Sequence, residues 1–439
     1  MLDKIIEKFK NKNIAILGFG REGRSTYKFL RSNLKDEKIT ILDKNNTIKD
    51  DEIFKIDQNI EFILGDNYLN NLDNFDIIVK TPGISLHNID TTKIINKIVS
   101  QCSLLLECTD FKTIAVTGTK GKSTTSTLIY EVIKAQNDNV FLMGNIGIPI
   151  FDYIDNFNKD SILVLELSAY QLEYIKKSPH ISILLNLYQE HLDYFKTLDN
   201  YYNSKLNILR NQNENDYGFY LYDNNKYIDN KIKSKLFAIN KDIYIKDNYI
   251  YFNKEKLYNI NEKRNLLGEH NLVNIMFVLG VSYILKLNMS KVIETINNFK
   301  GLEHRMELVG TYDNITFYND TIATIPEATI NCIKALKEVD TLIFGGMDRG
   351  IDYNNFIKEL NNSNIKNFIC MPDTGNKIGK QLINKNVYYE ENMEKVVKLA
   401  KKITTKGKIC LLSPAAPSYN KYKNFEEKGK LYKEYVRNK

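Results

Sequence analysis

Residues 114–125 read I-A-V-T-G-T-K-G-K-S-T-T, an apolar strand that passes through a glycine-rich loop into the start of a helix. The G-K-S-T ending is typical of a phosphate loop, whose backbone N–H groups cradle phosphates. We expect Lys122 to reach the β and γ oxygens of a nucleotide and Ser123 or Thr124 to hold Mg²⁺. The loop is shorter than the usual G-x-x-x-x-G-K-[ST] pattern, because Val116 stands where that pattern has glycine.

Strand and helix patterns alternate on both sides of this loop, which predicts α/β layers with parallel sheets. A helix is expected over 270–287. Residues 217–261 change to short Tyr/Ile/Lys/Asn stretches with Asp-Asn turns, which predict a small antiparallel insertion. The expected strands are 14–18, 39–42, 76–80, 113–117, 162–166, 181–186, 341–345, 365–371 and 408–412.

Three domains are expected. The chain has 439 residues, and a domain takes roughly 150. New series of strands begin near residues 113 and 302. The sequence therefore predicts a Rossmann-like domain over 1–112, a central P-loop ATPase-like domain over 113–301 and a Rossmann-like domain over 302–439.

Composition excludes several classes of protein. The 43% hydrophobic and 26% charged residues are ordinary for a packed core. The net charge of +7 is scattered along the chain, so we expect no nucleic-acid partner. No apolar run is long enough to span a membrane, and the charged N-terminus does not resemble a signal peptide. Five widely spaced cysteines without a C-x-x-C pair are expected to be buried thiols in the cytoplasm.

A second glycine-rich turn, Gly18-Phe-Gly20-Arg-Glu-Gly23, follows the first strand, and Asp43 ends the next one. This is the dinucleotide-binding fingerprint in its expected context, and it favours a nucleotide diphosphate at the helix N-terminus. A plain tight turn between strand and helix would also need these glycines. The motif does not say which nucleotide binds, so a nicotinamide-dependent enzyme remains an alternative on this turn alone.

Candidate metal ligands follow two strands of the second series. Glu166 ends an apolar strand, and His191 follows another, so both are expected at the sheet edge that carries the phosphate loop. Glu166 suits Mg²⁺, which takes one or two protein ligands beside phosphates and waters. His191 alone would more often start a helix or lie on the surface, and Lys205 would by default be an exposed helix lysine.

These motifs together resemble the Mur ligases, the ATP-dependent peptide-forming enzymes of cell-wall precursor synthesis, and in particular the members that add D-glutamate. The resemblance covers all three expected domains. Besides the two glycine-rich turns it rests on the following stretches: 81–84 (TPGI), 144–147 (GNIG), 166–173 (ELSAYQLE), 186–193 (NLYQEHLD), 268–271 (GEHN), 302–305 (LEHR), 319–324 (NDTIAT), 345–346 (GG) and 412–415 (LSPA).

The resemblance implies a role for individual residues. Lys122, Glu166, His191, Lys205 and Arg305 would be catalytic. Two Mg²⁺ ions would be held by Ser123, Thr124, Glu166, His191 and a Lys205 carbamylated by CO₂. ATP would be bound by Gly118, Thr119, Lys120, Gly121, Lys122, Ser123, Thr124, Asn271, Asn274, Arg305 and Asp320.

The two other substrates would lie in the outer domains. The UDP-linked substrate would be bound by Gly20, Arg21, Glu22, Asp43, Lys44, Thr81, Pro82, Gly83 and Asn145, and D-glutamate by Thr324, Arg349, Ser418 and Phe425. Three positions depart from the family pattern. Ile322 and Arg349 occupy positions where the family often has lysine, and Lys44-Asn45 replaces a Thr-Arg pair. The residues that would bind uracil are therefore the ones that the resemblance supports least.

The reaction implied is the addition of D-glutamate to UDP-N-acetylmuramoyl-L-alanine through an acyl phosphate, with only small molecules as partners and the enzyme a monomer. Alternatives within the family are the ligases that add L-alanine or a dibasic residue, and folylpolyglutamate synthase. From other classes, a nicotinamide oxidoreductase rests on residues 18–23, and a non-catalytic nucleotide switch rests on the phosphate loop.

Overall fold

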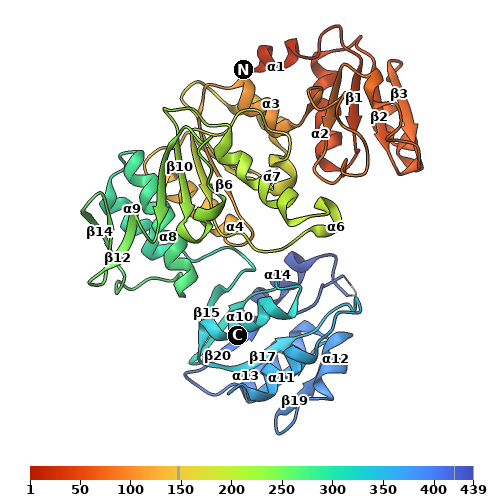
Figure 1. Cartoon of the computed structure of the whole chain (residues 1–439). Coiled ribbons are helices and arrows are strands. Elements are labelled where there is room, and N and C mark those ends of the chain that lie inside the picture. The colour runs from red at the N-terminus through yellow and green to blue at the C-terminus, as the bar shows by residue number, and fades with distance from the viewer. Residues whose placement is uncertain (146–148, 420, 439) are drawn as a thin grey trace. The chain divides into compact units, whose positions relative to one another are not determined.

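The computed structural model of the chain describes residues 1–145, 149–419 and 421–438. Within these ranges the strands form three sheets with helices packed beside them, as Figure 1 shows. The three-domain α/β architecture expected from the sequence is confirmed. The chain divides into two compact units, Met1–Glu262 with Leu272–Ile296 and Lys263–Asn271 with Asn297–Lys439. The boundaries at residues 112 and 301 stay predictions.

The first sheet has the strand order β3-β2-β1-β4-β5, and every pair in it is parallel. Strands β1, β2 and β4 are almost wholly buried, as parallel strands covered on both faces are. The strand order reverses at β1, so the topological switch point lies between β1 and β4. The elements are α1 (Leu2–Glu7), β1 (Ile14–Leu17), α2 (Arg21–Asn33), β2 (Ile39–Asp43), β3 (Ile60–Leu64), β4 (Ile77–Lys80), β5 (Ile98–Val99) and α3 (Gln101–Cys108).

The second sheet has the order β14-β13-β12-β11-β10-β9-β6-β8-β7. The phosphate-loop strand β6 lies between β8 and β9, parallel to both. The elements are β6 (Lys112–Thr117), α4 (Lys122–Lys134), β7 (Val140–Gly144), β8 (Ile162–Glu166), α5 (Ala169–Leu172), β9 (Ile181–Leu184), α6 (Leu192–Phe195), α7 (Leu198–Arg210), β10 (Tyr217–Leu221), β11 (Lys235–Ile239), β12 (Ile243–Lys246), β13 (Tyr249–Phe252), β14 (Glu255–Asn259), α8 (Glu269–Ile284) and α9 (Met289–Asn298).

The expected antiparallel insertion over 217–261 is wrong in its first half. Strands β10 and β11 pair in parallel with β9 and with each other, so they extend the same sheet. Only β12, β13 and β14 form an antiparallel meander. Phe219 and Ile239 are fully buried, and this burial against the parallel sheet overrides the polar turn signals between the strands.

The third sheet has the order β15-β16-β20-β17-β18-β19, with only the β15–β16 pair antiparallel among the described strands. Strand β17 is buried along its whole length. The elements are β15 (Glu307–Tyr312), β16 (Ile315–Asn319), α10 (Pro326–Leu336), β17 (Val339–Phe344), α11 (Asn354–Asn362), β18 (Asn367–Cys370), α12 (Thr374–Gly379), β19 (Asn386–Tyr389), α13 (Met393–Ile403), β20 (Ile409–Leu412) and α14 (Phe425–Arg437).

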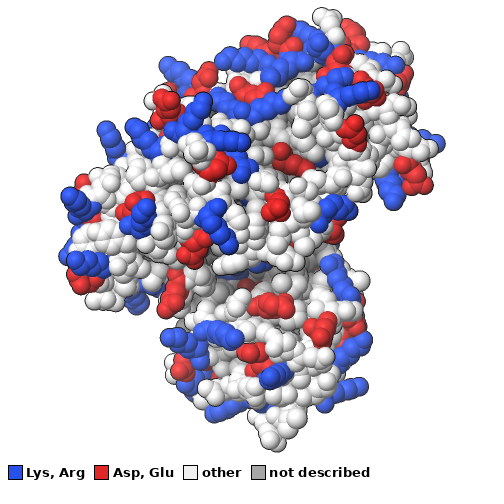
Figure 2. Space-filling model, viewed as in Figure 1, with Lys and Arg blue, Asp and Glu red and all other residues white. Residues whose placement is uncertain are grey.

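Surface and core agree with the composition. On the face drawn in Figure 2, basic and acidic side chains are interspersed. All five cysteines, which lie in the described part of the chain, are buried thiols without disulfides, as expected. Among the described helices, none has the length and apolar character that crossing a membrane requires.

Candidate active site

The phosphate loop joins β6 to α4 at the edge where the neighbouring parallel strands also end. Gly121 caps α4 with φ at +88°, and a Cβ atom there would lie 2.9 Å from Asn274 Oδ1, so the loop requires glycine. Asn186, just beyond β9, accepts a hydrogen bond from Lys120 N over 2.8 Å and donates one to Lys120 O over 3.1 Å. Two hydrogen bonds thus hold the loop against the end of the adjacent strand.

Two lysines meet at this loop. The Lys122 ammonium group donates to the carbonyl oxygens of Gly118 and Thr119, each over 3.0 Å. Lys205, on α7, is 2% exposed, and its ammonium group donates to the Gly118 carbonyl over 2.8 Å. Burial, and then the charge of Lys122, lower the pKa of Lys205 well below its usual range. Lys205 is therefore no exposed helix lysine, and its amine is poised to lose a proton.

A buried carboxylate lies at the end of β8, next to the loop. Glu166 is 1% exposed, and its Oε1 accepts a hydrogen bond from Asn145 Nδ2 over 2.7 Å. Its Oε2 has no hydrogen-bond partner among the described residues. Leaving a buried carboxylate oxygen without a partner is costly unless a cation or a proton completes the site. Of the 144–147 motif, residues 146 and 147 lie outside the described residues.

His191 stands at the first turn of α6 with a left-handed backbone, φ +57°. Its ring lies 5.2 Å from that of Tyr170 and 6.0 Å from that of Tyr201, centroid to centroid. Partial burial lowers the pKa of His191, with Lys205 adding to the effect and Glu190 opposing it. A neutral imidazole is the form that binds a metal.

These side chains fit a hard cation held largely by nucleotide phosphates. No group of three or more His, Cys, Asp or Glu side chains forms a ready-made metal site among the described residues. Mg²⁺ does not need one, because it takes one or two protein oxygens and completes its shell with phosphates and waters. The unpartnered Glu166 Oε2, together with the Ser123 and Thr124 hydroxyls at the start of α4, supplies such a set.

The other predicted loop residues are placed as follows. The Thr119 hydroxyl donates to Tyr188 O over 3.2 Å and lies 3.2 Å from the Tyr201 hydroxyl. The Lys120 ammonium group lies 2.5 Å from Glu190 Oε1, on the surface. Thr119 therefore holds the loop in place, while Lys120 has a charged partner already.

The first-sheet candidates gather at the switch point between β1 and β4. The Thr81 hydroxyl donates to Leu17 O over 3.0 Å, and a Cβ atom on Gly18 would lie 2.2 Å from that hydroxyl oxygen. Asp43 accepts hydrogen bonds from Phe19 N over 2.7 Å and from Asn45 N over 2.8 Å. The edge of the sheet where ligands bind in such folds is therefore built from these loops.

A cavity of about 480 Å³ opens beside this turn. Gly20 and Asp43, both predicted, line it. Sequence reasoning missed the other lining residues, although the loop after the second strand of a doubly wound sheet is a signal that could have found them. They are Phe19, Arg24, Asn45, Thr47, Ile48, Asp50 and Asp51.

The remaining residues expected to bind the UDP-linked substrate lie in or beside the loops that follow β1, β2 and β4. Glu22 accepts a hydrogen bond from Gln171 Nε2 over 3.3 Å, and burial raises the pKa of its carboxyl group. Arg21 begins α2 and is exposed, as are Lys44 and Gly83. Pro82, between Thr81 and Gly83, is partly buried.

In the second compact unit, Arg305 and Asp320 lie close in the fold. Asp320 follows β16 and accepts hydrogen bonds from Ser413 Oγ over 2.8 Å and from Met306 N over 3.1 Å. Burial raises the pKa of Asp320 to about 6, and Arg305 is among the groups that oppose the shift. The Nε atom of Arg305 is buried and lacks a partner among the described residues.

The four D-glutamate candidates belong to this unit as well. The Ser418 side chain is 2% exposed and its Oγ has no partner in the described part of the chain. The Arg349 guanidinium lies 5.9 Å from the centre of the Tyr419 ring. Phe425 begins α14, with its ring 5.9 Å from that of His304, and Thr324 is partly buried.

Asn271, one of the expected ATP-binding residues, donates from its Nδ2 to Leu267 O over 2.6 Å.

Three family models cover most of the chain. They are "Mur ligase MurD-like, N-terminal domain" over residues 12–101, "Mur ligase middle domain" over residues 116–282 and "Mur ligase, glutamate ligase domain" over residues 304–416. The chain therefore belongs to the Mur ligase family, and it is an ATP-dependent ligase of peptidoglycan precursor synthesis. This assignment decides against the nicotinamide oxidoreductase and the nucleotide switch.

Individual relatives match over their whole length. The UDP-N-acetylmuramoylalanine--D-glutamate ligase of Oenococcus oeni is 32% identical, with 98% of each chain covered. The protein of the same name from a Thermoanaerobacter species is 33% identical, over 97% of this chain and 98% of its own. Among solved structures, the MurF ligase of Thermotoga maritima in complex with ADP has the same fold, with a TM-score of 0.57, 17% identity and 99% of each chain covered.

Proposed function

We propose that the chain adds D-glutamate to UDP-N-acetylmuramoyl-L-alanine, using ATP to activate the alanyl carboxylate as an acyl phosphate. One observation carries the mechanism: the phosphate loop, the unpartnered buried carboxylate of Glu166 and the proton-releasing amine of Lys205 meet at one edge of the sheet. The names of the full-length relatives support the choice of substrates.

In the first step a carboxylate oxygen of the alanyl group attacks the γ-phosphorus of ATP, and the bond to the oxygen of ADP breaks. Two anions must approach one another, so the site needs positive charge. Lys122 supplies it from the phosphate loop, and Arg305 is the second cation that the resemblance to the family implies for this step. Bound Mg²⁺ would neutralise phosphate charge between Glu166 and the Ser123 and Thr124 hydroxyls.

Lys205 serves this site as a carbamate. The neutral amine attacks CO₂, a bond forms between nitrogen and carbon, and one proton is released to solvent. A buried cation becomes an anion whose oxygens suit a second Mg²⁺. His191 would be the other protein ligand of that ion. The lowered pKa of Lys205 supports this role, because only the neutral amine reacts.

In the second step the amine of D-glutamate attacks the acyl carbonyl carbon, the bond to the phosphate oxygen breaks and phosphate leaves. The positions proposed to receive D-glutamate are Thr324, Arg349, Ser418 and Phe425. The buried, unpartnered hydroxyl of Ser418 is free to donate to a carboxylate, and the exposed guanidinium of Arg349 can bind one through two parallel hydrogen bonds.

The deciding experiment measures phosphate release from ATP with UDP-N-acetylmuramoyl-L-alanine and a panel of amino acids, with each product identified by mass. We expect release with D-glutamate and not with L-alanine or dibasic residues. Turnover with UDP-N-acetylmuramate and L-alanine, or with a dibasic residue on a longer precursor, would show that the chain has the activity of another Mur ligase. Glutamate addition to a folate would indicate the remaining alternative.

A further inference from the structure

Four side chains form a cluster where the loop after β4 meets the α5–α6 segment: Lys80 and Tyr194, which are buried, and His87 and Glu173, which are partly buried. None of them belongs to the proposed reaction site. The Lys80 ammonium group donates to the Tyr194 hydroxyl over 2.8 Å and lies 3.6 Å from Glu173 Oε2. His87 Nε2 lies 2.8 Å from Glu173 Oε1. The cluster thus joins the end of β4, in the first sheet, to the end of α5 and to α6 within one compact unit.

Lys80 and Glu173 form a largely buried ion pair within this cluster. Lys80 is 4% exposed, and burial lowers its pKa to about 8 while Glu173 opposes the shift. A buried ion pair is often no more stabilising than apolar residues of the same volume, because both ions lose their hydration. What such a pair does supply is a fixed geometry, since neither ion can move without losing its partner.

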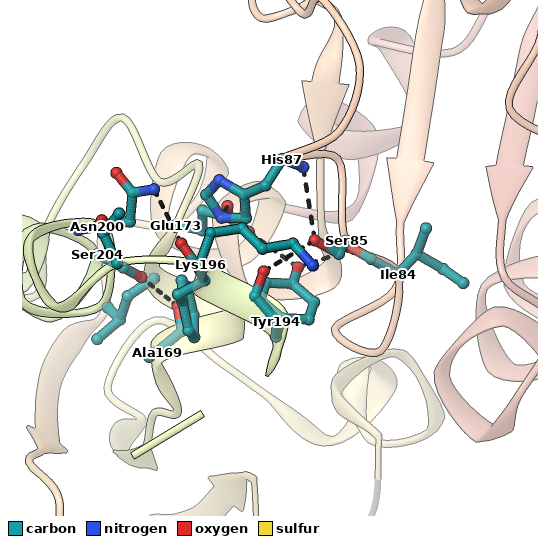
Figure 3. Close-up of polar contacts among 12 residues, drawn as sticks. Ile84, Ser85, His87, Ala169, Glu173, Tyr194, Lys196, Asn200 and Ser204 are labelled. Atoms are coloured by element: carbon teal, nitrogen blue, oxygen red, sulfur yellow. Dashed lines mark hydrogen bonds and ion pairs between the residues drawn. The ribbon is translucent and has the colours of Figure 1, made fainter. Parts of the chain in front are cut away.

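Tyr194 is the residue that this geometry fixes. Its hydroxyl oxygen lies within hydrogen-bond distance of two acceptors, Ile84 O at 2.7 Å and Glu173 Oε2 at 3.0 Å. The Ser85 hydroxyl donates to the backbone carbonyl of Tyr194 over 3.2 Å. Figure 3 shows Ser85 and His87 beside Tyr194 and Glu173, while the side chain of Ile84 points away from them. The loop therefore holds Tyr194 at both its side chain and its backbone.

Tyr194 in turn holds His191. The amides of Tyr194 and Phe195 donate to His191 O over 3.1 Å and 3.0 Å, and these bonds close the single turn of α6. The left-handed backbone of His191 is unfavourable for a residue with a side chain, so the surrounding structure must impose it. The anchored turn of α6 does so.

The same loop also reaches the nucleotide-sugar end. Thr81 N and Thr81 Oγ1 both donate to Leu17 O, over 2.9 Å and 3.0 Å, beside the turn at Gly18. A continuous series of contacts therefore runs from the glycine-rich turn through the loop and Tyr194 to His191.

We propose that Lys80, His87, Glu173 and Tyr194 are positioning residues that fix His191 relative to the nucleotide-sugar loop, so that binding of the UDP-linked substrate and binding of magnesium–ATP strengthen one another. The inference rests on the proposed function for the identity of the two ligands. Because such coupling is a free energy shared between two sites, it is the same whichever ligand binds first.

The test measures the dissociation constant of UDP-N-acetylmuramoyl-L-alanine by calorimetry on the full chain, with and without Mg²⁺ and a non-hydrolysable ATP analogue. In the wild-type chain we expect the analogue to tighten substrate binding by about fivefold or more. In Tyr194→Phe, which keeps the ring and removes the hydroxyl, the two dissociation constants should agree within about twofold. The value without the analogue should stay near that of the wild type.

Tyr220→Phe is the matched control. Tyr220 and Tyr194 are each 7% exposed, and the Tyr220 hydroxyl donates to Asn225 Oδ1 over 2.9 Å, away from the cluster. This variant should keep the coupling. The double variant Lys80→Met/Glu173→Gln, which removes both charges together, should lose it as Tyr194→Phe does.

Wild-type coupling in Tyr194→Phe would overturn the proposal, and so would a wild-type chain that binds both ligands independently. Loss of coupling in Tyr220→Phe as well would assign the effect to general loosening and overturn it too. A wild-type chain that binds neither ligand would contradict the proposed function itself, and the coupling with it.

Discussion

Lys122 and Lys205 place their ammonium groups on one acceptor, the carbonyl oxygen of Gly118, over 3.0 Å and 2.8 Å. Lys205 is buried, and the charge of Lys122 lies beside it. The result is the lowered pKa of Lys205. A change of Lys205 from cation to carbamate would convert this repulsion into an attraction, which gives the modification a physical reason in this chain.

Lys205→Ala should lower turnover by about 100-fold or more, because the variant cannot form the anion proposed to hold a metal, a loss of about 2.7 kcal/mol in the barrier. Small carboxylic acids such as acetate should restore part of the activity by filling the vacated space. Initial rates with and without acetate test this. Lys226→Ala, which removes an exposed lysine of the same unit, is the control and should behave as wild type. Full activity in Lys205→Ala would contradict the carbamate role.

Removing dissolved CO₂ should inactivate the enzyme slowly, and bicarbonate should reactivate it. The neutral amine is the reactive form, and a lowered pKa makes that form abundant at a lower pH than for an exposed lysine. Native mass spectrometry should therefore find one added CO₂ on the wild-type chain at neutral pH. The adduct should be missing from Lys205→Ala, and its persistence there would place the modification elsewhere.

Glu166→Gln should raise the Mg²⁺ concentration needed for half-maximal activity and lower turnover by about 100-fold. The amide oxygen can still accept the hydrogen bond from Asn145, but an NH₂ group then occupies the place of the unpartnered Oε2 and repels a cation. A Mg²⁺ titration of the rate measures both effects. Glu294→Gln, at an exposed position of α9, is the control. An unchanged Mg²⁺ requirement would remove Glu166 from the metal site.

Local patterns were enough to predict buried strands and the glycine-rich turns that follow two of them. The strand bounds 162–166 agree with β8, and the glycine positions alone locate both turns along the chain. The antiparallel expectation for 217–261 failed in its first half because the direction of β10 is set by its pairing with β9, a contact between segments far apart in the sequence. Turn residues predict the local conformation of the chain, but they do not predict which distant strand a segment pairs with.

The cavity beside Asp43 shows the same limit. Its lining includes Asp50 and Asp51, on a loop without a motif of its own. Likewise, nothing in the pattern around Lys80 predicts a buried ammonium group, because its partners Glu173 and Tyr194 come from another part of the chain, beside the second sheet. Burial of a lysine becomes visible only when the fold has assembled its partners.

Asp320→Asn should change how stability depends on pH. The pKa of Asp320 in the fold, about 6, lies above its ordinary value of 3.8, so the folded chain binds more protons than the unfolded one between these values. Stability from this group is therefore present at low pH and is lost as the pH rises through about 6. The wild-type free energy of unfolding should fall relative to that of Asp320→Asn by about 2 kcal/mol from about pH 4 to about pH 8. Urea unfolding of both chains at several pH values measures the difference. A constant difference would mean that Asp320 titrates normally.

Ile322→Lys should lower the KM for D-glutamate. Ile322 lies in the loop after β16, where its amide donates to His304 O over 3.1 Å, and its side chain is only partly buried. A cation there would face an incoming amino acid that carries two carboxylates. A partly exposed charge pair contributes about 0.2–1 kcal/mol, so the expected change is roughly 1.5- to 5-fold. Ile325→Lys places the same charge at a nearby residue that is 40% exposed, and it should leave the KM unchanged. Because the attraction is electrostatic, added salt should reduce the effect of Ile322→Lys. Equal KM values for the two variants at low salt would show that position 322 does not face the D-glutamate site.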